Sequence, residues 1–140
     1  MTNFEISKQL KEAGFEAETD FYWYCYDNGR ALRHVADADG KGNVKSYDLE
    51  TILDALPDSI TREYKSKEDG EVKKFREDLI IEKNKIRYSC DDIENADDAN
   101  RYFQEYGYMQ DIGVFKKFDE DSLADTAGRM WLELKKNKLI

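Results

Sequence analysis

The sequence is poor in the residues that carry much of enzyme and metal chemistry. It contains a single histidine, His34, and only two cysteines, Cys25 and Cys90. Small secreted domains that depend on disulfides carry more cysteines than this. We therefore interpret both cysteines as reduced thiols that fill small core positions, with one cross-strand bridge as the alternative, and we expect a cytoplasmic protein.

Long hydrophobic runs are also missing. No apolar segment approaches the roughly 18–20 residues that a membrane span needs. The N-terminal residues 1–5 lack a basic segment followed by an apolar one, so no secretory signal is expected. We expect no membrane partner.

Positive charge is the third deficit. The chain has 22 lysines and arginines against 31 aspartates and glutamates, a formal net charge of −9. Such a chain is repelled by nucleic-acid backbones and by anionic lipids, so we expect no direct nucleic-acid binding. An acidic surface can instead occupy the basic site of a partner protein, or it can simply maintain solubility.

Large apolar side chains, by contrast, are plentiful. Of the 140 residues, 40% are hydrophobic and 13% are aromatic, which is enough for a packed core and argues against intrinsic disorder. The length fits a single domain over residues 1–140. We expect two charged insertions in this domain, over residues 62–76 and 91–110.

Four amphipathic helices are predicted from apolar residues spaced three and four apart. They cover residues 4–13, 49–56, 96–106 and 123–136. Thr2 and Glu5 resemble a capping box for the first helix, and Gly14 is suited to its C-terminal end.

The second and the last helix are also marked at their ends. Asp48 is expected to cap the second helix, and Pro57 to end it. Ser122 and Asp125 form a capping pair for the last helix, and Asn137 is its predicted left-handed stop.

Two β-hairpins are predicted, over residues 21–35 and 79–90, with further strands at Ile60–Tyr64 and Val114–Phe118. Asn28-Gly29 predicts a type I′ turn in the first hairpin, and Lys83-Asn84-Lys85 connects the second. An antiparallel sheet built from these hairpins, with helices packed on it, defines an α+β fold.

The aromatic strand 21–26 has two different faces because side chains alternate along a strand. One face carries Phe21, Trp23 and Cys25; the other carries Tyr22, Tyr24 and Tyr26. We expect the Trp23 face to lie beneath the terminal helices. Whether the tyrosine face is covered or exposed is left open, and it is the preferred place for a functional surface on the sheet.

Residues 37–48 resemble the calcium-binding loop of an EF-hand. The loop has acids at its first, third and twelfth positions, glycine at the sixth and an aliphatic residue at the eighth. These positions are Asp37, Asp39, Asp48, Gly42 and Val44. However, lysines occupy two positions where oxygen ligands belong, and the preceding residues are predicted to form a strand instead of a helix. We favour a polar loop in which Asp48 caps the next helix, with divalent-metal binding as the less favoured alternative.

Three further patterns contain residue types that could carry chemistry. The acidic residues between 91 and 98 could chelate a metal, but a solvated loop explains them adequately. The three tyrosines could stack single-stranded nucleic acid, but such platforms need a basic surround. His34 could act as a base toward Cys25 or Cys90, but no glycine-rich turn accompanies such a pair. No catalytic, cofactor-binding or metal-binding residue is therefore predicted, no cofactor is expected, and the chain is interpreted as a non-enzyme.

Several short segments together resemble a known group of proteins. They are Ala13-Gly14-Phe15, Phe21-Tyr22-Trp23, Leu56-Pro57, Ser122-Leu123-Ala124-Asp125 and Asn137-Lys138-Leu139-Ile140. Their layout is similar to that of small uncharacterised proteins encoded by phages and prophages. The resemblance implies a fold and no activity.

Three functional hypotheses follow. The first is a non-enzymatic phage or prophage accessory protein that acts through protein–protein interaction. The second is an acidic nucleic-acid mimic or inhibitor of a basic host protein, with carboxylates from residues 91–98 and 119–121 on one face. The third is a divalent-metal-binding protein that uses the loop 37–48.

Overall fold

The computed structural model describes residues 1–37, 42–65, 70–83, 85–89, 112–116 and 122–140, and all structural statements concern these ranges. In chain order, the elements are α1 (Phe4–Glu12), β1 (Phe21–Tyr26), β2 (Gly29–His34), the 3₁₀ turn η1 (Val35–Asp37), β3 (Val44–Ser46), α2 (Leu49–Ala55), β4 (Ser59–Lys65), β5 (Val72–Glu82), β6 (Lys85–Ser89), β7 (Ile112–Lys116) and α4 (Leu123–Lys136). The α+β prediction is confirmed.

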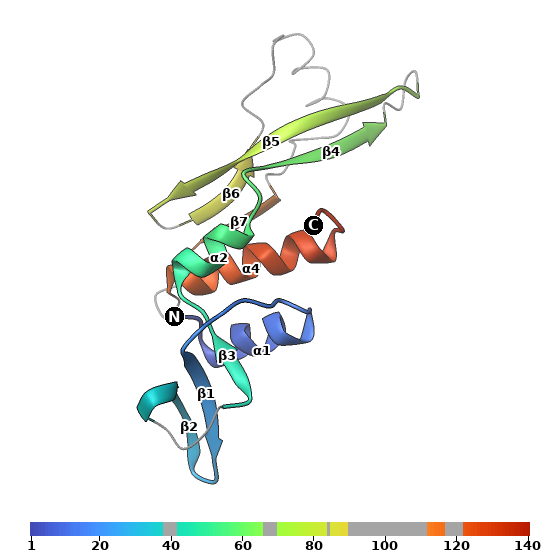
Figure 1. The fold of residues 1–140 in the computed structure, drawn as a ribbon. Coiled ribbons are helices and arrows are strands. Elements are labelled where there is room, and N and C mark those ends of the chain that lie inside the picture. The colour runs from blue at the N-terminus through green and yellow to red at the C-terminus, as the bar shows by residue number, and fades with distance from the viewer. Residues whose placement is uncertain (38–41, 66–69, 84, 90–111, 117–121) are drawn as a thin grey trace.

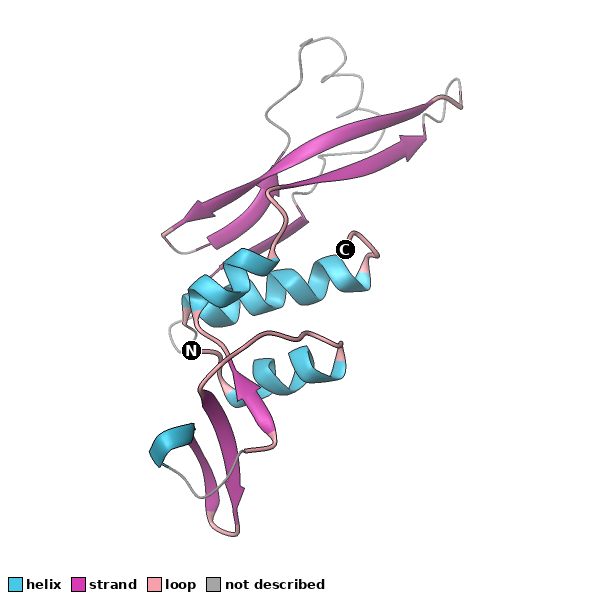
Figure 2. Ribbon diagram, viewed as in Figure 1, coloured by secondary structure: helices cyan, strands magenta, loops and turns pink. Residues whose placement is uncertain are grey.

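The strands form two antiparallel sheets, not the one sheet that the sequence suggested. Sheet A has the order β2-β1-β3, and sheet B has the order β4-β5-β6-β7. Helices α2 and α4 lie between the two sheets, and α1 lies beside α4 and β3 (Figure 1). The helical layer separates the two predicted hairpins because α2 carries the chain from β3 on one side to β4 on the other (Figure 2).

Helix α1 begins one residue later than the capping pattern predicted. Its N-cap is Asn3, whose side-chain oxygen accepts a hydrogen bond from the amide of Ile6 at 2.9 Å. Thr2 is instead almost fully buried, and its hydroxyl contacts the Ser7 hydroxyl at 2.6 Å and accepts from the Tyr47 amide at 3.0 Å. The predicted capping box at Thr2 is therefore wrong, because these long-range partners occupy the hydroxyl.

The other helix ends follow the sequence closely. Asp48 caps α2 by accepting a hydrogen bond from the Thr51 amide at 2.8 Å. Ser122 and Asp125 form both hydrogen bonds of a capping box at the start of α4. At the end of α4 the left-handed residue is Lys138, with φ of 57°, in place of the predicted Asn137.

The turn between β1 and β2 lies one residue earlier than Asn28-Gly29. Tyr26 pairs directly with Gly29, so the two turn residues are Asp27 and Asn28. Gly29 has φ of 144°, a backbone conformation that residues with a side chain rarely adopt. The glycine was a correct signal for a tight hairpin, but it follows the turn instead of forming its second half. The type I′ prediction is wrong, because neither Asp27 nor Asn28 has the positive φ that such a turn needs.

Sheet B contains the second predicted hairpin as β5 and β6, and β4 includes the strand predicted at Ile60–Tyr64. Strand β7 overlaps the strand predicted at Val114–Phe118. The described parts of the expected charged insertion 62–76 form the far half of the β4–β5 hairpin. The helix predicted over 96–106 and most of the insertion 91–110 lie outside the described residues.

Helix α4 is the centre of the core. Most of its length is buried, and it contacts α1, α2, β6 and β7. A Cβ atom placed on Gly128 would lie 2.7 Å from Cγ2 of Ile6 and 3.4 Å from Cδ1 of Leu10. The absence of a side chain at Gly128 therefore allows α1 to cross α4 at close range.

One ion pair is buried on the core face of sheet B. Glu77 is only 1% exposed, and Arg62 donates to both of its carboxylate oxygens through Nε and Nη2. Glu77 lies opposite Ile60, so both charged residues share the face that packs on the core. A bidentate pair of this kind satisfies charges that would otherwise be very costly to bury.

We predict that Glu77→Ala strongly destabilises the protein, by about 3–5 kcal/mol, because it removes the carboxylate that accepts two hydrogen bonds from the largely buried guanidinium of Arg62. The matched control is Glu63→Ala on the opposite face of the same hairpin. Glu63 is 62% exposed and pairs with Lys74 at 3.4 Å, so its loss should cost about 0–1 kcal/mol. Urea unfolding measures both variants, and equal small losses would contradict the interpretation.

We also predict that Gly128→Ala lowers stability although alanine is the better helix former. Overpacking against Ile6 is expected to cost about 1–3 kcal/mol, against a propensity gain of roughly 1 kcal/mol. In an Ile6→Ala background the added methyl group has room, so the same substitution should become neutral or stabilising. A double-mutant cycle by thermal or urea unfolding tests this coupling, and an identical cost in both backgrounds would refute it.

Candidate functional site: the tyrosine face of sheet A

The tyrosine face of sheet A comprises Tyr22, Tyr24, Tyr26 and Arg33, and its exposure increases along β1. Tyr22 is 8% exposed, Tyr24 is half-buried and Tyr26 is 48% exposed. The Tyr24 and Tyr26 rings are stacked, with centroids 6.5 Å apart and planes inclined by 18°. The Arg33 guanidinium lies 5.8 Å from the centre of the Tyr26 ring. This face is therefore covered at one end and open at the other.

The opposite face of β1 is less covered than the sequence suggested. The Phe4 ring of α1 packs edge-on against Trp23 at 6.1 Å, and the Trp23 indole N–H donates to the Thr2 carbonyl at 3.2 Å. Phe21 is 37% exposed, however, and Cys25 is also exposed. The prediction that this face lies beneath the terminal helices is only partly correct: α1 partly covers Trp23, whereas Phe21 and Cys25 are exposed.

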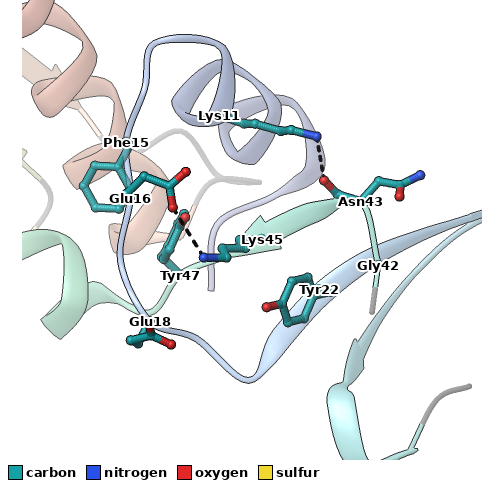
Figure 3. Close-up of a pocket in the computed structure, with 9 residues that line it drawn as sticks. All are labelled: Lys11, Phe15, Glu16, Glu18, Tyr22, Gly42, Asn43, Lys45 and Tyr47. Atoms are coloured by element: carbon teal, nitrogen blue, oxygen red, sulfur yellow. Dashed lines mark hydrogen bonds and ion pairs between the residues drawn. The ribbon is translucent and has the colours of Figure 1, made fainter. Parts of the chain in front are cut away.

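A pocket of about 340 Å³ lies where the tyrosine face is covered, at Tyr22 (Figure 3). Its apolar walls are the rings of Phe15, Tyr22 and Tyr47, all of which are buried. Its polar lining is formed by the side chains of Lys11, Glu16, Glu18 and Lys45 and by residues 42–43. The residues come from α1, the α1–β1 connection, β1 and the segment that leads through β3 to α2.

Two local features bring these rings together. After Gly14, with φ of 87°, the chain reverses and the Phe15 amide donates to the Leu10 carbonyl at 2.9 Å. Phe15 then packs edge-to-face against Tyr47 at 4.7 Å and against Trp131 of α4 at 5.0 Å. The pocket wall is thus anchored in the core of the protein.

Gly42 closes the pocket beside β1. A Cβ atom at this position would lie 2.5 Å from the Trp23 carbonyl oxygen and 2.8 Å from Cβ of Tyr22. The chain passes so close to β1 that only glycine fits without a shift of the backbone. This close approach gives Gly42, the sixth residue of the loop that resembles an EF-hand, a structural role that involves no calcium.

The two lysines of the pocket are held in place by oxygen atoms. Lys45, the cross-strand neighbour of Tyr22, lies 3.4 Å from Oε2 of Glu16 and donates to the Ala17 carbonyl at 3.3 Å. Lys11 donates to the Asn43 carbonyl at 2.8 Å. These contacts fix two ammonium groups at an aromatic pocket within a chain that is acidic as a whole.

The two phenol groups of the pocket differ. Burial raises the pKa of Tyr47 to about 12, with further contributions from the nearby Glu16 carboxylate and Tyr22, against a backbone hydrogen bond with Ala17 that lowers it. The Tyr22 hydroxyl points into the pocket and forms no hydrogen bond within the described part of the chain. Tyr47 is therefore a neutral wall group, whereas Tyr22 has a hydroxyl available to a ligand.

The raised pKa of Tyr47 predicts a loss of stability at alkaline pH. Its contribution is fully present below pH 10, the ordinary pKa of a phenol, and is lost as the pH rises toward about 12. Tyr47→Phe should reduce this alkaline loss of folding stability by about 2 kcal/mol. Some alkaline destabilisation should remain in the variant, because burial also raises the pKa of Tyr88. Denaturant unfolding between pH 9 and 12 measures the effect.

The control for the alkaline experiment is Ile52→Val, a core substitution without a phenol. It should lower stability by a similar amount at every pH and leave the slope unchanged. A Tyr47→Phe curve parallel to that of the unmodified protein would contradict the assignment.

The loop 37–48 is only partly described, since residues 38–41 and the Asp37 side chain lie outside the description. Asp48 uses its carboxylate to cap α2, and the hydrogen bonds with Thr51 lower its pKa. Strand β2 and η1 precede the loop, so no EF-hand helix enters it. Within the described ranges, no group of three or more His, Cys, Asp or Glu side chains is placed to hold a metal. Metal binding by this loop stays the less favoured alternative.

The pairing of His34 with Cys25 is not supported by the register. His34 lies opposite Phe21, four residues along β1 from Cys25, a separation of about 13 Å. The His34 Nδ1 atom accepts from the Ala36 amide at 3.0 Å, and its ring packs edge-on against Phe21. Cys90 and the acidic residues 91–98 and 119–121 lie outside the described residues.

Sequence reasoning selected the tyrosine face but missed the pocket at its end. The missing information was the pairing of β1 with β3, which places Lys45 beside Tyr22. The Gly14-Phe15 turn was recognised as a helix end, but nothing in the sequence shows which residues the Phe15 ring contacts.

No protein-family model matches this chain, and no curated protein and no solved structure is significantly similar to it. None of the helices in the described ranges has the length and apolar character needed to cross a membrane.

Proposed function

We propose that this chain is a non-enzymatic protein that acts by binding another protein through the tyrosine face of sheet A. The observation that carries the proposal is the stacked Tyr24–Tyr26 pair with Arg33 beside it, at the end of β1 where Tyr26 is 48% exposed. Tyrosine and arginine are enriched at the energetic centres of protein interfaces. Rings that are already stacked lose little conformational freedom on binding, so more of the contact energy appears as affinity.

A nucleic-acid partner is less favoured for the same surface. Stacked tyrosines can hold bases, but phosphate contacts dominate nucleic-acid affinity, and this chain has a net charge of −9. A protein partner does not need a strongly basic surface. A role as a phage or prophage accessory factor, which the sequence resemblance suggested, is consistent with a binding protein and is part of this proposal.

An enzyme is less favoured on geometric grounds. Among the described residues, His34 and Cys25 are too far apart to act as base and nucleophile, and the Tyr47 phenol stays neutral up to alkaline pH. The alternative of an acidic nucleic-acid mimic depends on residues 91–98 and 119–121, outside the description. It predicts competition with DNA for a basic protein.

The proposal predicts that a partner protein contacts Tyr26. A photo-reactive benzoylphenylalanine placed at Tyr26 in the source organism should cross-link one recurrent protein. The matched control places the same group at Val72 of β5, which is 56% exposed but lies in sheet B. Arg33→Ala should reduce the Tyr26 cross-link several-fold because it removes the adjoining cation.

Cross-links of equal yield at Tyr26 and Val72 would show that the tyrosine face has no special role. Recovery of nucleic acid from the Tyr26 cross-link would contradict the proposal of a protein partner and favour a nucleic-acid partner for this face.

A further inference from the structure

The pocket at Tyr22 offers more hydrogen-bond donors than its own residues use. Tyr22 is only 8% exposed, and its hydroxyl has no hydrogen-bond partner in the described part of the chain. Each lysine ammonium group has three N–H donors. Lys11 uses one on Asn43, and Lys45 uses its donors on Glu16 and Ala17 at distances of 3.3–3.4 Å. The pocket therefore has unused donor capacity around a buried aromatic wall.

We propose that this pocket binds a carboxylate attached to a large apolar side chain, as found at the C-terminal residue of a partner polypeptide. This inference rests on the proposed function and names the chemistry of the partner. The carboxylate would accept hydrogen bonds from the Tyr22 hydroxyl and from the ammonium groups of Lys45 and Lys11. Hydrogen bonds to a charged group are roughly twice as strong as those between neutral groups.

The apolar part of such a residue fits the walls of the pocket. The rings of Phe15, Tyr22 and Tyr47 surround a space of about 340 Å³, at the small end of the range for ligand pockets and suited to one large side chain. The residues that precede a C-terminus would leave the pocket along β1 toward Tyr24 and Tyr26. The distance from Tyr22 to Tyr26, four strand residues or about 13 Å, is the length of about four residues of extended peptide.

Two acidic residues, Glu16 and Glu18, also line the pocket. Glu16 is paired with Lys45 at 3.4 Å, so its negative charge is largely offset by that ammonium group. Glu18 is exposed, and no partner of its side chain is found among the described residues. A bound carboxylate would be repelled by Glu18, whereas a bound cation would be attracted by it. Neutralising Glu18 therefore has opposite effects on the two classes of ligand.

The experiment uses N-acetylphenylalanine, which has the aromatic ring and the carboxylate, and its C-terminal amide as the matched probe without charge. Binding to the full chain is followed by NMR, through the chemical shifts of the protein's backbone N–H groups. For a ligand of this size we expect a millimolar dissociation constant for the acid, at least about tenfold weaker binding of the amide, and the largest shifts at residues 42–47.

Three variants test the residue assignments. Tyr22→Phe should weaken binding of the acid about tenfold and leave the melting temperature unchanged, because the hydroxyl has no partner in the fold. Glu18→Gln should strengthen binding about two- to threefold by removing the like charge. The control Lys8→Gln, an exposed lysine of α1 outside this pocket, should leave binding unchanged.

Three results would each overturn the proposal: equal affinity for the acid and its amide, weaker binding of the acid by the Glu18→Gln variant, or no chemical-shift changes at about 20 mM acid. A partner cross-linked at Tyr26 provides the second arm. If amidation of the partner's C-terminus does not reduce the yield of this cross-link, the pocket inference fails while the proposed function stands. If the acid binds as expected but no protein is cross-linked at Tyr26, the proposed function fails and the pocket is a site for small carboxylates.

Discussion

The close crossing of α1 and α4 at Gly128 sets the arrangement of the elements packed around it. Helix α4 packs against α1, α2 and sheet B, so its position fixes how these described elements are arranged. A methyl group at Gly128 would lie 2.7 Å from the Ile6 side chain. Helix α1 can approach α4 this closely only because that methyl group is missing. The residues that follow the C-terminal end of α1, Gly14 and Phe15, therefore lie next to the core. The packing at Gly128 therefore fixes the position at which the α1–β1 connection begins.

From that point a chain of aromatic contacts extends to the surface. Trp131 contacts Phe15, Phe15 contacts Tyr47, and these rings form or support the wall of the pocket at Tyr22. Edge-to-face contacts add orientation to the energy of burial, so the wall is fixed before any ligand arrives. The candidate site is thus an extension of the core, and its outer part becomes gradually more exposed along β1.

Charge acts locally in ways that the net value does not reveal. The chain carries −9, yet the Arg62–Glu77 pair, which is buried on the core face of sheet B, is neutral as a unit. The pocket likewise balances Lys11 and Lys45 against Glu16 and Glu18. The net charge determines behaviour at long range, mainly repulsion from polyanions, whereas short-range recognition depends on which few side chains meet.

Features that depend on neighbours a few residues apart could be predicted from the sequence. The Asp48 cap, the Ser122–Asp125 capping box and the β5–β6 hairpin each need only local hydrogen bonds or alternation, and each was predicted correctly. Contacts between distant segments are responsible for the division into two sheets, the shift of the first cap to Asn3 and the assembly of the pocket. Thr2 is drawn away from its helix by Tyr47 and Ser46, more than forty residues along the chain. Such contacts depend on how the elements pack in three dimensions, and no local spacing in the sequence encodes them.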